Sequence, residues 1–336
     1  MKSGEHSGPR LDSERVAEGS QPGAAAAQGM RMPWSIGLYA GSTPTKLEPL
    51  GDASRPILDA SRVDDVPAHF VADPFAIECE GSWFLFFEVL RSDTGLGEIG
   101  LAVRDQVVRD QVVRDRVGPG DGSDPTGLAT GWSYRGIVLR EPYHLSYPSL
   151  VVEPGNDEIY MVPETLDAGS VRIYRAVRFP EVWEPVADLV PGQLADPTIF
   201  FHAGQWWLFA CSTPYQHDTL RLYGAESLLG PWREHPESPL IVGDRARARP
   251  CGKPIRWGRR LLRLAQDCEP IYGRRVRVFE ILELSPTTYR ERELPESPIL
   301  EGTGHGWNAL KMHHLDAHRW GEDPSAGWLA FVDGRG

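Results

Sequence analysis

The chain has 336 residues, including 35 glycines and 29 prolines, and its formal net charge is −12 at pH 7. This charge argues against a nucleic-acid-binding protein, because contact with phosphate groups requires a concentrated basic surface. No stretch is apolar over the length needed to cross a bilayer, so we expect no membrane span.

The first 29 residues differ in composition from the rest. They are rich in Gly, Ser, Ala, Glu and Gln and contain no Phe, Trp or Tyr. Such a segment cannot bury enough apolar surface to offset its ordering entropy, so residues 1–29 are predicted to be a disordered tail. Residues 30–336 are predicted to form a single domain. Because the N-terminus lacks the apolar region of a secretory signal, the expected location is the cytoplasm.

From Trp34 onward, short runs rich in β-branched and aromatic residues alternate with turn residues, which is typical of strands. Five segments resemble one another: SIGLYAG (35–41), EIGLAVR (98–104), VRIYRAV (171–177), LRLYGAE (220–226) and VRVFEIL (276–282). All but the first follow a predicted hairpin, at residues 71–90, 147–164, 195–211 and 249–267. Three of them are followed by a tryptophan and a further strand. Four strands repeated five times predict an all-β, five-bladed β-propeller.

The two chain ends each carry half of a repeat. The hairpin at 311–333 has no third strand after it, and SIGLYAG has no hairpin before it. We therefore expect the N-terminal and C-terminal strands to combine into the last blade, which closes the ring and leaves no unpaired strand edge.

The blade arrangement also predicts a site. One mouth of a propeller channel is lined by the starts of the first strands and the ends of the second strands. The first-strand starts are Asp73, Tyr147, Asp196, Arg249 and His313 or His314. The second-strand ends are Glu88, Glu164, Cys211 with Ser212, Gln266 with Asp267, and Asp333. Clustered acids shift one another's pKa, as acid–base chemistry requires, so this set predicts a carboxylate-lined axial pocket.

Several of these residues have a structural interpretation as well. Asp73 and Asp196 each precede a proline, which favours an extended residue before it and is common at strand starts. Their recurrence at the same point of two blades favours a site. The pair His313-His314 fits metal ligands or a hydrogen-bonded lining. We favour the lining and expect no metal or other cofactor.

The blade openers A-D-P-F (72–75) and A-D-P-T (195–198) resemble those of glycoside hydrolase families 43, 32, 62 and 68. More segments, from VADPFAI (71–77) to GWNALKMHHLD (306–316), are similar to the N-terminal domain of plant glucosamine inositolphosphorylceramide transferases and bacterial relatives. The similarity spans about residues 33–334. In those plant proteins, the transferase chemistry is attributed to a separate domain.

The hydrolase resemblance implies that Asp73 is a base or nucleophile and that Asp196 orients or tunes the acid. The acid in those families is a Glu of a later blade, where this chain has Arg249-Pro250 and Gln266-Asp267. The acid is left among Glu164, Asp267 and His314. Our predicted catalytic residues are Asp73, Glu164 and Asp196. The predicted substrate-binding residues are Glu88, Tyr147, Arg249, Gln266, Asp267, His313 and His314.

Three functions fit the sequence. The first is a carbohydrate-active enzyme that hydrolyses or transfers a glycosyl unit through two carboxyl groups. The second is a non-catalytic, sugar-binding propeller that supports a glycosyltransferase or a glycan pathway. The third, disfavoured by the acids at the mouth, is a protein-interaction surface. Fold alone does not decide among them. The expected ligand is a sugar or glycoconjugate.

Overall fold

The computed structural model describes residues 32–105, 124, 127–320 and 327–336. The predicted tail, residues 1–29, lies outside the described residues. The described chain consists of strands and turns with short 3₁₀ segments such as Ala60–Arg62 and Gly306–Asn308. Within these residues, no helix has the length and apolar character to span a membrane. Cys79, Cys211, Cys251 and Cys268 are free thiols.

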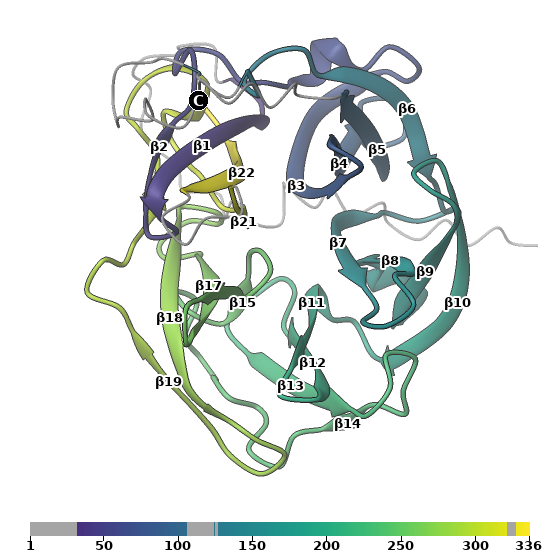
Figure 1. Cartoon of the computed structure of the whole chain (residues 1–336), viewed down its shortest axis with the longest axis vertical. Coiled ribbons are helices and arrows are strands. Elements are labelled where there is room, and N and C mark those ends of the chain that lie inside the picture. The colour runs from purple at the N-terminus through teal and green to yellow at the C-terminus, as the bar shows by residue number, and fades with distance from the viewer. Residues whose placement is uncertain (1–31, 106–123, 125–126, 321–326) are drawn as a thin grey trace, which may run out of the picture.

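The strands form five sheets arranged as blades around a central axis (Figure 1). Blade one is β3 (Ala68–Cys79), β4 (Ser82–Arg91), β5 (Gly97–Arg104) and β6 (Ser133–Leu139). Blade two is β7 (Ser146–Val152), β8 (Ile159–Glu164), β9 (Ser170–Arg178) and β10 (Val182–Pro191). Blade three is β11 (Ala195–His202), β12 (Gln205–Cys211), β13 (Leu220–Ala225) and β14 (Arg233–Glu234).

Blade four is less regular. Its main path is β15 (Arg249–Pro250), β17 (Arg260–Asp267), β18 (Arg275–Leu284) and β19 (Tyr289–Glu293). Two short strands, β16 (Ile255–Trp257) and β20 (Leu300–Glu301), pair with β17 and β18. The five-bladed all-β fold predicted from the repeats is confirmed.

Blade five joins the two ends of the described chain. Its strand order is β21 (Leu315–Arg319), β22 (Trp328–Gly334), β1 (Ser35–Thr43) and β2 (Lys46–Pro49). Strand β1 runs antiparallel to β22, with a continuous register from Ser35 opposite Gly334 to Gly41 opposite Trp328. The predicted closure of the last blade by N-terminal and C-terminal strands is confirmed.

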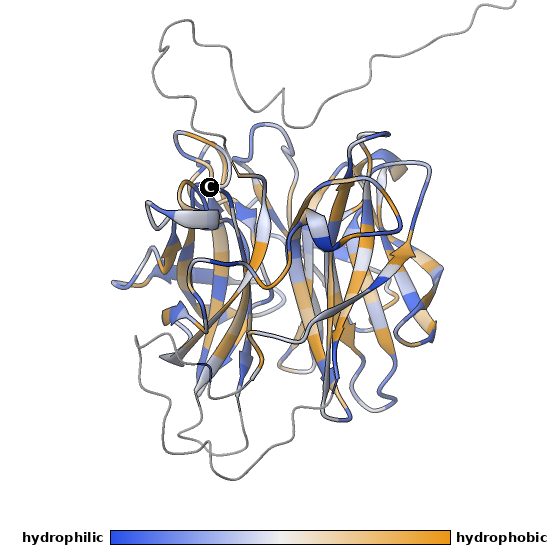
Figure 2. Ribbon diagram, turned by 90° about the horizontal axis from the view of Figure 1, so that it is seen from above, coloured by the Kyte–Doolittle hydropathy of each residue, from blue (hydrophilic) through white to orange (hydrophobic). Residues whose placement is uncertain are grey.

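The hydrophobic core is a ring of clusters between neighbouring blades. One cluster joins Phe75 and Leu101 of blade one to Met161 and Tyr174 of blade two. Similar clusters lie between blades two and three, three and four, four and five, and five and one. Figure 2 shows the apolar residues concentrated in the strands. Each blade therefore buries both faces against its neighbours, which holds the strands around the axis in place.

A truncation that begins at residue 50 is expected to aggregate. It removes β1 and β2, takes the buried Ile36 and Leu38 from the core, and leaves β22 with an unpaired edge. Size-exclusion chromatography and thermal unfolding measure the effect. A truncation that begins at Met30 is the control, since it keeps both strands. A monodisperse protein that lacks residues 35–49 would show that the ring does not depend on this closure.

Candidate functional site at the propeller axis

The first strands of blades one to three share an unusual backbone feature. The φ angles of Asp73, Tyr147 and Asp196 are positive, at 52°, 49° and 50° respectively. Each precedes a proline and lies at an irregularity in the pairing of the first and second strands. A non-glycine residue in the left-handed region costs on the order of 1–3 kcal/mol, and such strain is concentrated at functional sites. Three equivalent strained residues facing one axis indicate a built site.

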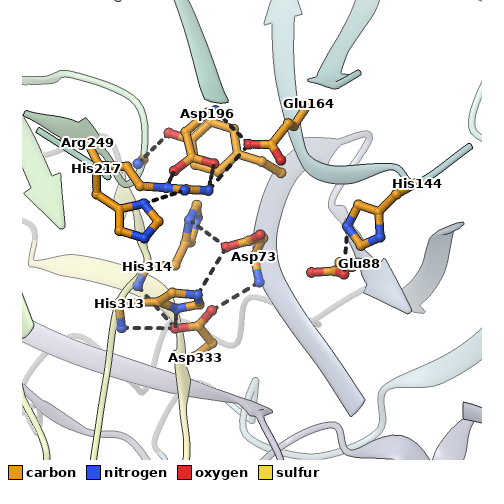
Figure 3. A network of polar contacts seen from close by, with 12 residues as sticks. Asp73, Glu88, His144, Glu164, Asp196, His217, Arg249, His313, His314 and Asp333 are labelled. Atoms are coloured by element: carbon orange, nitrogen blue, oxygen red, sulfur yellow. Dashed lines mark hydrogen bonds and ion pairs between the residues drawn. The ribbon is translucent and has the colours of Figure 1, made fainter. Parts of the chain in front are cut away.

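Arg249 opens blade four and binds the carboxylates of two other blades. Its Nε donates to Asp196 Oδ2 at 2.5 Å, and its Nη2 lies 3.2 Å from Asp196 Oδ1 and 3.3 Å from Glu164 Oε2. The backbone N–H of Asp196 donates to the same Glu164 oxygen at 3.0 Å. All three side chains are less than 10% exposed, at 9%, 6% and 7% for Arg249, Asp196 and Glu164. Figure 3 shows this group as one network.

Burial raises the pKa of Asp196 to about 6, against the opposing effect of Arg249. At neutral pH, Asp196 is therefore ionised and paired. Arg249 is held in turn by the Pro214 carbonyl at 3.1 Å and by His217 Nδ1 at 3.0 Å. Burial, with Arg249 second, lowers the pKa of His217 to about 3, so the ring is neutral and accepts this hydrogen bond.

Asp73 faces a different environment. Burial, followed by the charges of Asp333, Glu88 and Asp196, raises the pKa of Asp73 well above its ordinary value of 3.8. Its nearest cationic or neutral partners are histidines: Oδ1 is 3.9 Å from His313 Nε2 and 3.7 Å from His314 Nδ1. Both distances exceed a hydrogen bond. Within the described residues, the Asp73 carboxyl group accepts no hydrogen bond, and its side chain is 13% exposed.

Asp333, at the end of β22, organises the lower part of Figure 3. Its Oδ2 accepts the N–H of Asp73 at 3.0 Å. Its Oδ1 accepts the N–H groups of His313 and His314, at 3.2 and 3.0 Å, and lies 2.6 Å from His313 Nδ1. Burial acts to raise the pKa of Asp333, but the two histidines and the Asp73 N–H hold it below its ordinary value. Asp333 is therefore a buried, ionised hydrogen-bond acceptor.

His314 and Gln266 lie in the same region with unsatisfied polar atoms. Both are almost fully buried, and neither ring nitrogen of His314 nor Gln266 Nε2 has a hydrogen-bond partner among the described residues. Burial lowers the pKa of His314 to about 4, so the ring is neutral. Buried polar atoms without partners are uncommon in folded proteins and are consistent with a water or ligand that meets them.

The remaining predicted residues have other tasks. The Tyr147 hydroxyl lies 2.8 Å from Thr198 Oγ1 and accepts the N–H of Gly252 at 2.6 Å, which links blades two, three and four. Glu88 lies 3.3 Å from His144 Nε2, beside blade two. His144 Nδ1 accepts the N–H of Gly97, so Nε2 carries the proton toward Glu88.

Asp267 does not join the axial group. Its Oδ2 accepts hydrogen bonds from Arg275 at 2.7 Å and Arg277 at 2.8 Å, both on the neighbouring strand β18, and Oδ1 accepts the N–H of Glu269. Burial opposes ionisation, but these donors lower the pKa of Asp267. We therefore treat Asp267 as a structural residue of blade four and remove it from the candidate acids and binding residues.

The sequence interpretation missed three residues of the mouth. Trp34 stacks on the His313 ring with centroids 4.0 Å apart, and Tyr272 meets the same ring edge-on at 5.5 Å. The Arg249 guanidinium lies 5.3 Å from the Tyr272 ring centroid, and His217 binds Arg249 as described. His217 and Tyr272 lie in the loops that follow the second strands β12 and β17, where no repeating pattern of the sequence marks them.

One cluster of two aspartates and a histidine has the spacing of a metal site. Single ligand atoms of Asp73, His313 and Asp333 lie within 4.8 Å of one another. The two Asp333 oxygens, however, already accept the hydrogen bonds from three backbone N–H groups and one imidazole. Asp333 Oδ1 accepts three of these bonds and Oδ2 accepts one, so Asp333 is already engaged by the protein, and the donor set fits a hydrogen-bonded network better than a metal.

A separate cavity of about 380 Å³ lies on blade three. Its lining includes Gln205, Trp207, Glu226, Arg233 and His235, near the start of β12 rather than its axial end at Cys211. This cavity is therefore distinct from the axial network.

Residues 120–335, well over half of the chain, match the family described as "Glucosamine inositolphosphorylceramide transferase 1, N-terminal". The chain belongs to this family. The Oryza sativa subsp. japonica protein "Glucosamine inositolphosphorylceramide transferase 1" is 32% identical over 324 residues, which cover 90% of this chain and 40% of the rice protein. The Arabidopsis thaliana protein of the same name is 32% identical, with 90% and 39% covered. The chain thus spans about two fifths of these relatives.

Solved glycoside hydrolases share the propeller fold. The catalytic domain of a Coprinopsis cinerea family 62 α-L-arabinofuranosidase superposes with a TM-score of 0.55 at 13% identity, covering 91% of this chain and 97% of that domain. The Cellvibrio cellulosa α-L-arabinanase superposes with a TM-score of 0.51 at 15% identity, covering 80% and 93%. At these identities, the comparison establishes the fold alone.

Proposed function

We propose that the chain acts on a glycosidic bond at the propeller axis, with Asp73 as the proton donor and Glu164 as the opposing carboxylate. One observation carries the proposal: the acidic groups of the axis have different partners. Arg249 binds the carboxylates of Asp196 and Glu164, whereas the Asp73 carboxyl group accepts no hydrogen bond from the described residues, and burial with neighbouring acids raises its pKa. Cleavage of a glycosidic bond needs this division between an acid and a carboxylate. The family and the shared hydrolase fold support a carbohydrate ligand.

Glu164 is the better carboxylate of the two that Arg249 binds. Arg249 occupies both Asp196 oxygens, whereas the Arg249 and Asp196 donors meet only Oε2 of Glu164. Oε1 of Glu164 has no hydrogen bond within the described residues, which leaves it available to a water or an acceptor hydroxyl. Asp196 then orients Glu164 and Arg249. This assignment makes Asp73 the acid, whereas the hydrolase resemblance implied a base or nucleophile.

The second candidate function is sugar binding without turnover. Arg249 stands on the blade where the hydrolase resemblance expects the acidic Glu, and it neutralises two of the three predicted catalytic carboxylates. A binding propeller would then serve the transferase region of longer relatives, of which this chain spans about two fifths.

A panel of aryl glycosides, oligosaccharides and nucleotide sugars tests both functions through turnover and thermal shift. With any substrate that the parent protein turns over, Glu164→Gln is expected to lower the rate by roughly 10²-fold or more, because the amide cannot take a proton. Glu226→Gln is the matched control in the blade-three cavity and should change neither rate nor binding. Ligand binding without turnover across the panel would favour the second function, and binding lost in Glu226→Gln would move the site to blade three.

A further inference from the structure

His313 is held on three sides by contacts that the proposed acid–carboxylate pair does not require. Trp34 stacks on one face with an interplanar angle of 20°, and Tyr272 meets the ring at 77°. Asp333 binds both the backbone N–H and Nδ1 of the residue. The ring is 5% exposed. An aromatic side chain packed and hydrogen-bonded in this way has a single orientation.

The contact with Asp333 sets the protonation of the two ring nitrogens. The Asp333 carboxylate accepts hydrogen bonds only, and it lies 2.6 Å from Nδ1, so Nδ1 carries the proton. In the neutral ring, Nε2 is then an acceptor with a free lone pair. No hydrogen bond to Nε2 is formed by the described residues, and the Asp73 carboxyl lies 3.9 Å from it.

We propose that His313 and Asp333 are positioning residues for Asp73: Asp333 holds the Nδ1–H form of His313, and His313 Nε2 accepts a hydrogen bond from the protonated Asp73 carboxyl group in the resting protein. The inference rests on the proposed function, because it assigns a purpose to the proton on Asp73. The two groups must approach by about 1 Å to form a hydrogen bond. The strained backbone of Asp73 is held from the same side, since its N–H binds Asp333 as well.

This arrangement keeps the Asp73 carboxyl group protonated between turnovers. A neutral hydrogen-bond acceptor beside Asp73 favours the protonated carboxyl group. A cation at the same place would favour the ionised carboxylate. When a glycosidic oxygen enters, it replaces Nε2 as the acceptor of that proton. His313 therefore acts through Asp73 and need not touch the sugar.

Long-range ¹H–¹⁵N spectra of the histidine rings in ¹⁵N-labelled protein test the proposal without any substrate. We expect His313 to be the Nδ1–H form at neutral pH. His235 is the internal reference for the opposite form, because its Nδ1 accepts the N–H of Glu237 and its Nε2 faces the Ser285 carbonyl. His313→Phe keeps an aromatic ring against Trp34 and identifies the His313 signals by their loss. A protonated Nε2 at neutral pH would overturn the proposal.

Asp73→Ala tests the second contact. Removing the carboxyl group should move the His313 Nε2 resonance toward that of a free acceptor, and an unchanged resonance would count against the link. Where a substrate is found, His313→Phe should lower kcat by about 10–100-fold with little change in KM, and His313→Gln should recover part of the loss by supplying an amide oxygen. Asp333→Asn is a poor first test, since Asp333 also accepts three backbone N–H groups.

The two proposals fail separately. The expected ring form without turnover on any sugar would remove the proposed function and leave the geometry of His313 as described. Turnover with an Nε2–H ring would remove the positioning role and leave Asp73 as the acid.

Discussion

Replacing Arg249 by methionine is expected to lower the free energy of unfolding by about 3–5 kcal/mol. Methionine has a similar length but no charge, so it leaves the Asp196 and Glu164 carboxylates side by side in a buried environment without a cation. Breaking a buried ion pair from one side costs more than the pair itself contributes, because the remaining charge stays desolvated. Urea unfolding at pH 7, followed by tryptophan fluorescence, measures the loss.

The triple variant Arg249→Met, Asp196→Asn, Glu164→Gln separates charge from packing. It removes the two stranded carboxylates along with the cation, so it should recover most of the lost stability. Arg290→Met is the matched surface control, because the Arg290 and Glu283 side chains are 70% and 38% exposed, and such pairs contribute little. If Arg249→Met were no more destabilised than Arg290→Met, the pairing of Arg249 with Asp196 and Glu164 would not contribute to stability.

The deficit of the single variant should also depend on pH. Without Arg249, burial and mutual repulsion favour protonation of Asp196 and Glu164 in the folded state. The folded variant then binds more protons than the unfolded chain, so its stability falls as pH rises. The difference from the parent protein should therefore shrink as pH is lowered toward 4.

The blades could be predicted because their signals are local. A hairpin such as β11–β12 combines two short apolar runs with the turn at Ala203-Gly204, where both residues have positive φ angles. Repetition of this unit then identifies the fold. The pairing of β1 with β22 is distant in sequence, yet it follows from counting strands, because half a blade was missing at each end.

The site was harder to predict from the sequence than the fold, for two physical reasons. Adjacent residues of a strand point to opposite faces, so Gln266 and Asp267 could not both be assigned from their place at a strand end. The structure directs Asp267 to Arg275 and Arg277, while Gln266 remains near the axis with an unsatisfied amide. His217 and Tyr272 lie in irregular loops, whose conformation follows from contacts with Arg249 rather than from any periodic pattern.

Protonation states were also beyond the sequence. Asp73 and Asp196 open equivalent strands with the same Asp-Pro pair, but only Asp196 meets Arg249 directly. The pairing distinguishes two residues that look alike in the sequence, and it is the reason why we propose Asp73 as the acid rather than as the base or nucleophile that the hydrolase resemblance implied.

Asp73→Asn is expected to lower the rate on any substrate by on the order of 10²–10⁴-fold, because the amide cannot donate a proton to a leaving oxygen. The same change should raise stability at neutral pH by on the order of 1 kcal/mol, or about 2–4 °C in melting temperature. Loss of activity with a gain in stability distinguishes a strained catalytic group from a structural one.

The sign of the stability change follows from the raised pKa. In the unfolded chain, Asp73 titrates near its ordinary value of 3.8, and in the folded protein burial and the surrounding acids move this titration upward. Below pH 3.8, the residue is protonated in both states and contributes nothing. As pH rises from there to the folded-state pKa, only the folded state keeps the proton, so stability falls. The charged and titratable groups that face Asp73 are Glu88, Asp196, Arg249, Tyr272, His313, His314 and Asp333.

Asparagine does not titrate, so the gain of Asp73→Asn over the parent protein should be near zero at pH 3.5 and should increase as pH rises toward 8. Asp52→Asn, at an exposed aspartate whose pKa is lowered by Ser54, is the matched control and should show no such gain. A variant that is less stable than the parent at pH 7 would mean that Asp73 is ionised and held by its neighbours. Together with an unchanged rate, that result would return the acid to another residue. A stabilised but inactive variant would instead support Asp73 as the proton donor, protonated in the folded protein at neutral pH.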